Sequence, residues 1–139
     1  MKPDEELKQT FEIFIDEENS IIGGVFLKEI KGAEDNARQT KLIEEAVLEI
    51  FNKNPQKKYK TFLDLLPLGI GMVYTSAENR KTWARLSSHK QIEKCAVIGS
   101  SILLKVIADF VIRLSDRSKD IKWFFGKEEA LKWLKEERV

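Results

Sequence analysis

The stretch KCAVIGSSILLKVIADFVIRLS, residues 94–115, decides the fold because two different periodicities meet within it. Residues 94–99 form a short apolar run, which is typical of a strand buried between layers of helices. Over residues 101–115 the apolar side chains recur at three- and four-residue spacing, which predicts a helix. A buried strand that leads directly into a helix is the repeating unit of α/β proteins. The stretch therefore predicts an α/β fold.

The same alternation continues on both sides of this stretch. Two short apolar runs near the start are separated only by the polar turn DEENS, so they predict an antiparallel hairpin. The later strands alternate with helices, which favours parallel neighbours in a mixed sheet. Strands are predicted at residues 11–15, 21–27, 59–66, 94–99 and 121–125, and helices at residues 35–52, 76–86, 101–115 and 127–137.

The length of the chain and the lack of repeats or low-complexity tracts indicate one domain. A chain of 139 residues corresponds to a single domain that can bury a core without metals or disulfides. It contains no internal repeat and no low-complexity tract. We expect residues 1–10, which are mostly polar, to be an N-terminal extension and residues 11–139 to form the domain.

The composition excludes several classes of protein and partner. A net charge of +1 provides no basic face for a nucleic acid. The single cysteine cannot form a disulfide within the chain, which suggests a reducing compartment. The polar start MKPDEELKQT is not a signal peptide, and no apolar run approaches the roughly 20 residues of a membrane span. We therefore expect a cytoplasmic protein.

The predicted helix at residues 101–115 is apolar around most of its circumference. Its charged side chains, Lys105, Asp109 and Arg113, fall in a single line. A helix on a sheet needs only one apolar stripe, so a second face of this helix requires another cover. Neighbouring helices, a second subunit, or a lipid or other apolar ligand could provide it. The candidate interaction residues on this helix are Leu103, Ile107, Phe110, Val111 and Leu114.

A second candidate surface lies at the start of the helix at residues 76–86. The sequence TSAE, which begins at Thr75, matches the capping-box pattern, so Thr75 is well explained as a helix cap. Ser76 follows it at the first helical position, where a phosphate would meet free amides and the positive end of the helix. Thr75, Ser76 and Arg80 are therefore candidates for a phosphoacceptor or partner-binding loop.

The sequence contains no recognisable catalytic or metal-binding pattern. His89 is the only histidine and lies in a polar linker, while Cys95 falls in a buried-strand pattern. The glycines of LGIGM lack the lysine and hydroxyl residue of a phosphate loop. Asp64 interrupts an apolar strand, where it could face a site, cap a loop or pair with an arginine. We therefore predict no enzyme, no metal and no cofactor.

Several segments together resemble SpoIIAA-like proteins of the STAS-domain family. The segments that carry the resemblance are the terminal GKEEALKWLK, which follows a strand ending in aromatic residues, FLDLL, AENRKTWARL and KCAVIGSSILLKVIADFV. The resemblance implies a mixed sheet with four helices packed mainly on one face. The family's phosphorylatable serine would correspond by order to the Thr75 and Ser76 region, although Ala77 and Glu78 stand where the family motif has glycine.

The resemblance also implies a mode of action. STAS domains are mostly non-catalytic and act through protein partners, as anti-sigma-factor antagonists do. We therefore expect a regulatory domain that works by protein–protein interaction, with a homodimer among the expected assemblies. A related branch of the family looks like lipid-binding SEC14-type domains. The alternative function is therefore a carrier or sensor of a lipid or small apolar ligand.

Overall fold

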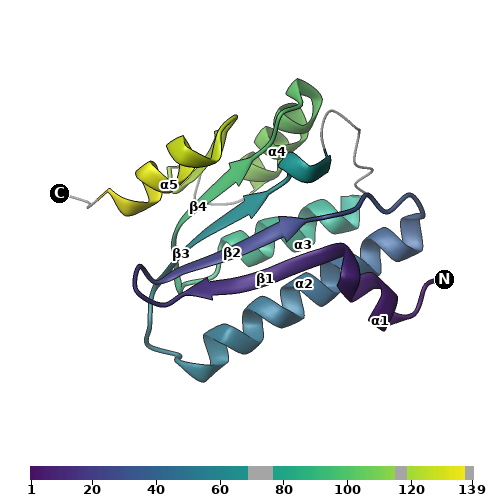
Figure 1. Cartoon of the computed structure of the whole chain (residues 1–139), viewed down its shortest axis with the longest axis horizontal. Helices are drawn as coiled ribbons and strands as arrows, with labels where there is room; N and C mark the ends of the chain where they lie inside the picture. Colours follow the sequence, from purple (N-terminus) through teal and green to yellow (C-terminus); the bar gives the residue numbers. More distant parts are fainter. Residues whose placement is uncertain (69–76, 115–118, 137–139) are drawn as a thin grey trace.

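The structure, a computed structural model, describes residues 1–68, 77–114 and 119–136. Five strands form one sheet in which the strands lie side by side in chain order (Figure 1). They are β1 (Phe11–Asp16), β2 (Ile21–Phe26), β3 (Tyr59–Asp64), β4 (Ile92–Ile98) and β5 (Ile121–Phe124). β1 is antiparallel to β2, and the other neighbouring pairs are parallel. The predicted mixed sheet with an N-terminal hairpin is confirmed.

The hairpin depends on a polar turn and on a glycine in its second strand. In the turn, the Asp16 carboxylate accepts hydrogen bonds from the backbone and side-chain nitrogens of Asn19, at 3.2 and 2.9 Å. In β2, a Cβ atom added to Gly23 would lie 2.5 Å from ring atoms of both Phe14 and Phe62. These two rings pack edge to face, with centroids 5.7 Å apart. Glycine at this position therefore allows the aromatic pair to close over the strand.

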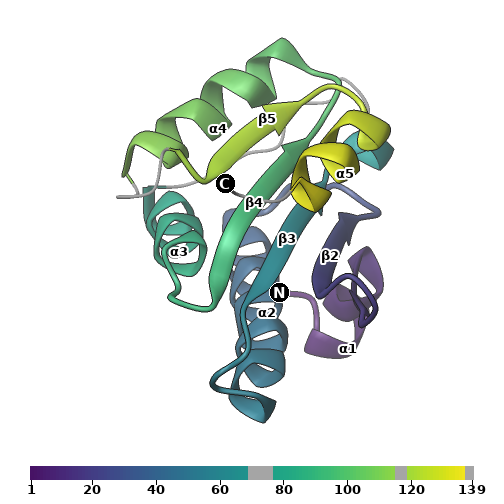
Figure 2. The same cartoon turned by 90° about the vertical axis from the view of Figure 1, so that its left-hand side faces the viewer.

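Helices cover both faces of the sheet. α2, α3 and α4 lie on one face, and α5 lies on the other (Figure 2). Three of the four predicted helices thus share a face, in agreement with the expected packing. Among the described residues, none of the helices is long and apolar enough to pass through a bilayer. The bounds are α1 (Asp4–Leu7), α2 (Ala33–Lys53), α3 (Ala77–Ser87), α4 (Ile102–Leu114) and α5 (Lys127–Lys135), with 3-10 turns η1 (Lys8–Thr10) and η2 (Leu66–Leu68).

The larger core lies between the sheet and the layer formed by α2, α3 and α4. At one end of this core, the Phe51 side chain of α2 is completely buried. Its ring stacks on His89 at 4.4 Å and packs against Tyr59 at 5.8 Å. The buried amide of Gln91 donates to the backbone oxygen of Phe51 and to those of two residues in the following turn. Apolar packing and hydrogen bonds therefore both hold the C-terminal end of α2.

The smaller core lies under α5. Ala130 and Leu134 are completely buried against the sheet, and the ring of Trp133 lies 5.5 Å from that of Phe124. Lys94 of β4 is also buried, and its Nζ donates to the backbone oxygens of Trp133 at 2.7 Å and Glu136 at 3.2 Å. A cation at the C-terminal end of a helix is favourable because that end carries partial negative charge. Lys94 therefore anchors α5 to the sheet.

The N-terminal residues, expected to form an extension, contribute to the main core. Residues 4–10 form α1 and η1, and the side chain of Leu7 is completely buried. Arg38 of α2 donates from Nε and Nη2 to the two carboxylate oxygens of Asp4, at 3.0 and 2.8 Å. This bidentate hydrogen bonding to Arg38 lowers the pKa of Asp4. The segment is therefore packed against α2.

Candidate functional site

Helix α4 begins directly after the buried strand β4. The hydroxyl of Ser101 accepts a hydrogen bond from the backbone nitrogen of Leu104 at 3.3 Å, and the Ser101 backbone oxygen accepts one from Lys105 at 3.1 Å. This is the geometry of an N-cap, which satisfies amide groups that the first turn leaves free. Leu104 is buried against the main core. The cap and this anchor fix which face of α4 turns outward.

The outward face of α4 carries four large apolar side chains that the other described residues leave exposed. Ile102 is 74% exposed and Val106 is 59% exposed, while Leu103 and Phe110 are each 49% exposed. Ile102, Val106 and Phe110 stand four residues apart, so they form one row along the helix. Contiguous exposed apolar surface of this kind marks interaction sites in soluble proteins. We call these four residues the α4 outer face.

Charged groups border the α4 outer face. Lys105 and Asp109 form an ion pair with 3.0 Å between Nζ and Oδ2, and Arg113 is exposed one turn further along. From α3, the guanidinium of Arg80 lies over the ring of Phe110, 5.3 Å from its centroid. An apolar centre with a polar rim is the usual arrangement of a protein–protein interface.

The structure brings two of the predicted site regions into contact and leaves other predicted residues undescribed. Arg80, predicted as part of a loop site, contacts Phe110 of the predicted interaction helix, and Leu103 lies on the same outer face. Thr75 and Ser76 lie outside the described residues, so their role as cap or phosphoacceptor stays a prediction. The structure describes the helical backbone, but not the side chains, of Ile107, Val111 and Leu114.

The predicted interaction residues omitted Ile102 and Val106, which are the most exposed members of the α4 outer face. A signal for them exists in the sequence. Ile102, Val106 and Phe110 each stand three positions before a member of the charged line Lys105, Asp109 and Arg113. Residues three apart are neighbours on a helix surface, so the solvent-facing charges mark the adjacent apolar row as outward.

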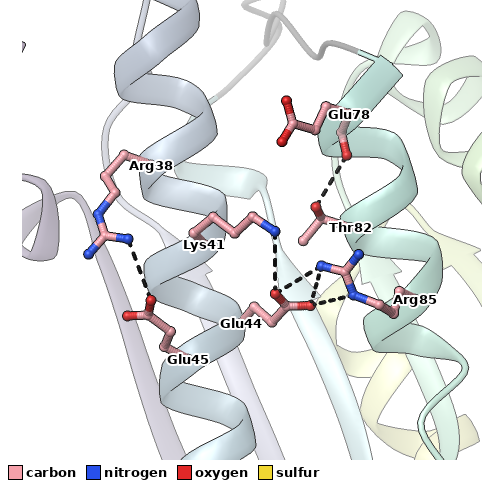
Figure 3. A network of polar contacts seen from close by, with 7 residues as sticks. All are labelled: Arg38, Lys41, Glu44, Glu45, Glu78, Thr82 and Arg85. Atoms are coloured by element: carbon pink, nitrogen blue, oxygen red, sulfur yellow. Dashed lines mark hydrogen bonds and ion pairs between the residues drawn. The ribbon is translucent and has the colours of Figure 1, made fainter.

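Polar contacts fix α3 against α2 and thereby position Arg80. The guanidinium of Arg85 donates to both carboxylate oxygens of Glu44, at distances from 2.9 to 3.1 Å (Figure 3). Closer to the start of α3, the buried amide of Asn79 donates to the side-chain oxygen of Asn36, which is also buried. A hydrogen bond between two buried amides favours a single register of the two helices.

Asp64 and His89 both have structural partners. The Asp64 carboxylate accepts a hydrogen bond from the backbone nitrogen of Leu66 at 2.9 Å, so it caps the turn after β3. Nδ1 of His89 accepts one from the backbone nitrogen of Gln91 at 3.1 Å. Across residues 1–68, 77–114 and 119–136, no three histidine, cysteine, aspartate or glutamate side chains are grouped as metal ligands would be.

The environment of His89 predicts a pH-dependent stability. Burial and the nearby charge of Lys90 hold the pKa of His89 below its ordinary value of 6.5. The unfolded chain therefore binds a proton more readily, and we expect the melting temperature to decrease as the pH falls through about 6.5. In His89→Phe, which keeps a ring against Phe51, the decrease should be smaller. Equal pH profiles for the two proteins, measured by circular dichroism, would contradict this assignment.

The fold and the α4 outer face define a small mixed-sheet α/β domain with an exposed apolar face on one helix. The chain belongs to the family described as domain of unknown function DUF7793, whose profile matches residues 36–138. A crystal structure of a protein of unknown function from Arthrobacter sp. FB24 is similar to it, with 20% sequence identity and a TM-score of 0.30. That similarity covers 88% of this chain and 97% of the other. No curated protein matched the sequence.

Proposed function

We propose that this protein is a non-catalytic, STAS-like regulatory domain that acts through protein–protein interaction, and that the α4 outer face is its docking surface. The observation that carries the proposal is the exposed row Ile102, Val106 and Phe110. Large apolar side chains at the centre of such a patch contribute most of the affinity of an interface. A cytoplasmic location is part of the proposal and is supported by the single cysteine.

The occupant we propose for this face is a second copy of the chain. The row is symmetric about Val106, so an antiparallel copy places Ile102 of each protomer against Phe110 of its partner. The smallest of the three side chains then lies at the crossing point, where the two helices approach most closely. A two-fold contact of this type uses the same patch on both protomers. The rim carries charges of both signs and the net charge is +1, so two copies do not repel strongly.

The proposal predicts that Val106→Arg abolishes self-association. Wild-type protein should form a dimer of about twice the 16.1 kDa monomer mass as its concentration rises. A buried arginine at the crossing point should weaken the dimer by about 100-fold or more, because two like charges would face each other without water. Sedimentation velocity over a broad concentration series measures the dissociation constant.

The matched control is Leu27→Arg. Leu27 is a partly exposed apolar residue that follows β2, the neighbour of the edge strand β1, whereas α4 contacts β5 at the other edge of the sheet. This variant should dimerise like the wild type. A wild-type protein that stays monomeric at every concentration would reject the second copy as occupant. Equal disruption by both arginine variants would place the dimer contact elsewhere than on α4.

A further inference from the structure

A partly open cavity lies in the main core between the sheet and its three covering helices. Its volume is about 160 Å³. All five strands contribute to its floor, and α2, α3 and α4 form its roof. Leu63 and Val97, on the two central parallel strands, are only partly buried although both belong to the face that the helices cover. The lining residues that carry the argument are Ile13, Gly24, Leu63, Trp83, Val97 and Ala108.

The floor and the roof of this space each contain a small residue. On the floor, Gly24 has no side chain, and an added Cβ would lie 3.3 Å from Cδ1 of Ile13 and 3.5 Å from Cδ1 of Leu63. On the roof, Ala108 of α4 presents only a methyl group. Protein interiors are normally packed as densely as organic crystals, and voids larger than a water molecule are few. At position 24 even a methyl group would press on Ile13, whereas a bulkier residue at position 108 would occupy part of the space.

The chemistry of the wall selects a neutral apolar occupant. Among the described residues that line the cavity, none carries a charged side chain. Two hydroxyl groups belong to the described lining, and both are engaged as donors. Thr61 donates to the backbone oxygen of Lys94, and Ser87 donates to that of Ala84. A charged or strongly polar molecule would lose its hydration here without gaining partners. The apolar wall is also unfavourable for water, because a buried water molecule needs several polar partners.

We infer that this cavity is a binding site for a small neutral apolar molecule, about the size of one aromatic ring or a short hydrocarbon. The size follows from the volume, since an apolar cavity of about 150 Å³ in another protein stays dry and binds benzene. The site is independent of the α4 outer face. The cavity is bounded by the inner side of α4, at Leu104 and Ala108, whereas the docking row lies on the outer side.

A titration with benzene that is monitored by methyl NMR tests the inference. In the wild type, the methyl signals of Ile13, Leu63 and Val97 should shift in a saturable manner, and methyl groups of the α5 core should not. Ala108→Leu fills the cavity from the roof and should weaken benzene binding about tenfold or more, because the added carbon atoms occupy the site. Ala46→Leu, at a partly buried position of α2 outside the lining, is the matched control and should bind normally.

Two outcomes would overturn the inference. One is the absence of saturable shifts at the cavity methyl groups of the wild type. The other is unchanged benzene affinity in folded Ala108→Leu. If Ala108→Leu does not fold, the smaller change Ala108→Val also adds carbon atoms to the roof, and its affinity for benzene decides in the same way. Val106→Arg should bind benzene like the wild type whatever its oligomeric state, so the ligand site and the proposed dimer fail separately.

Discussion

Replacing Phe51 with alanine should lower the free energy of unfolding by about 4 kcal/mol. The Phe51 side chain is completely buried, and it packs against both Tyr59 and His89. Truncation removes the whole ring and leaves a cavity that the β3 backbone and the end of α2 cannot close. The buried Gln91 amide donates to the Phe51 backbone oxygen, so a shift of the Phe51 backbone would also weaken this hydrogen bond. Among single truncations, this is one of the largest effects that we expect.

Urea denaturation followed by circular dichroism measures the change in the free energy of unfolding. Phe125→Ala is the matched control because it removes the same ring from a position that is 52% exposed. We expect this control to change stability by less than about 1 kcal/mol. A loss below about 2 kcal/mol in Phe51→Ala would show that the end of α2 can repack around the missing ring, contrary to the packing described here.

Replacing Gly99 with alanine should lower the free energy of unfolding by about 2 kcal/mol. An added Cβ would lie 2.6 Å from Cη2 and 3.0 Å from Cζ2 of Trp123, which is closer than carbon atoms approach one another. Trp123 is almost completely buried, so its rigid ring cannot move aside without disturbing the main core. Gly32→Ala is the control, since its Cβ would meet only a carboxylate oxygen of Asp35 at 3.8 Å.

A double-mutant cycle with Trp123→Phe identifies the cause of this loss. Phenylalanine lacks the outer ring atoms of tryptophan, so Gly99→Ala should destabilise the Trp123→Phe protein much less than the wild type. Within the described residues, the buried Nε1 of Trp123 has no hydrogen-bond partner, so this exchange breaks no hydrogen bond. Strictly additive effects in the cycle, measured by urea denaturation, would show that the close approach to Trp123 is not the reason for glycine at position 99.

Much of the fold could be predicted from the sequence because each element carries its own periodic pattern. The helix predicted at residues 35–52 occupies Ala33–Lys53, and the strand predicted at residues 94–99 occupies Ile92–Ile98. The N-terminal segment was harder to place. Its polar composition predicts an extension, yet one leucine, Leu7, packs into the core and Asp4 pairs with Arg38. A single buried side chain in a short helix leaves no periodic signal.

The candidate site was only partly predictable for a similar reason. An apolar pattern around α4 indicates that some face lacks a cover, but the orientation of the helix depends on which residue meets the sheet. Leu104 takes that place, and Ile102 and Val106 consequently turn outward. The contact between Arg80 and Phe110 joins two helices that are separated by a strand in the sequence. No local pattern predicts such a contact.

The sequence by itself determined the order of strands and helices, the antiparallel start of the sheet and the surplus of apolar residues on α4, because these follow from local periodicity and turn chemistry. Only the tertiary structure decided which face of α4 stays exposed and where the cavity lies. Both depend on residues from distant segments, because the described lining of the cavity comes from all five strands and from α2, α3 and α4. Packing depends on which residues of two elements meet. A local sequence pattern describes each element alone and does not show which residues meet.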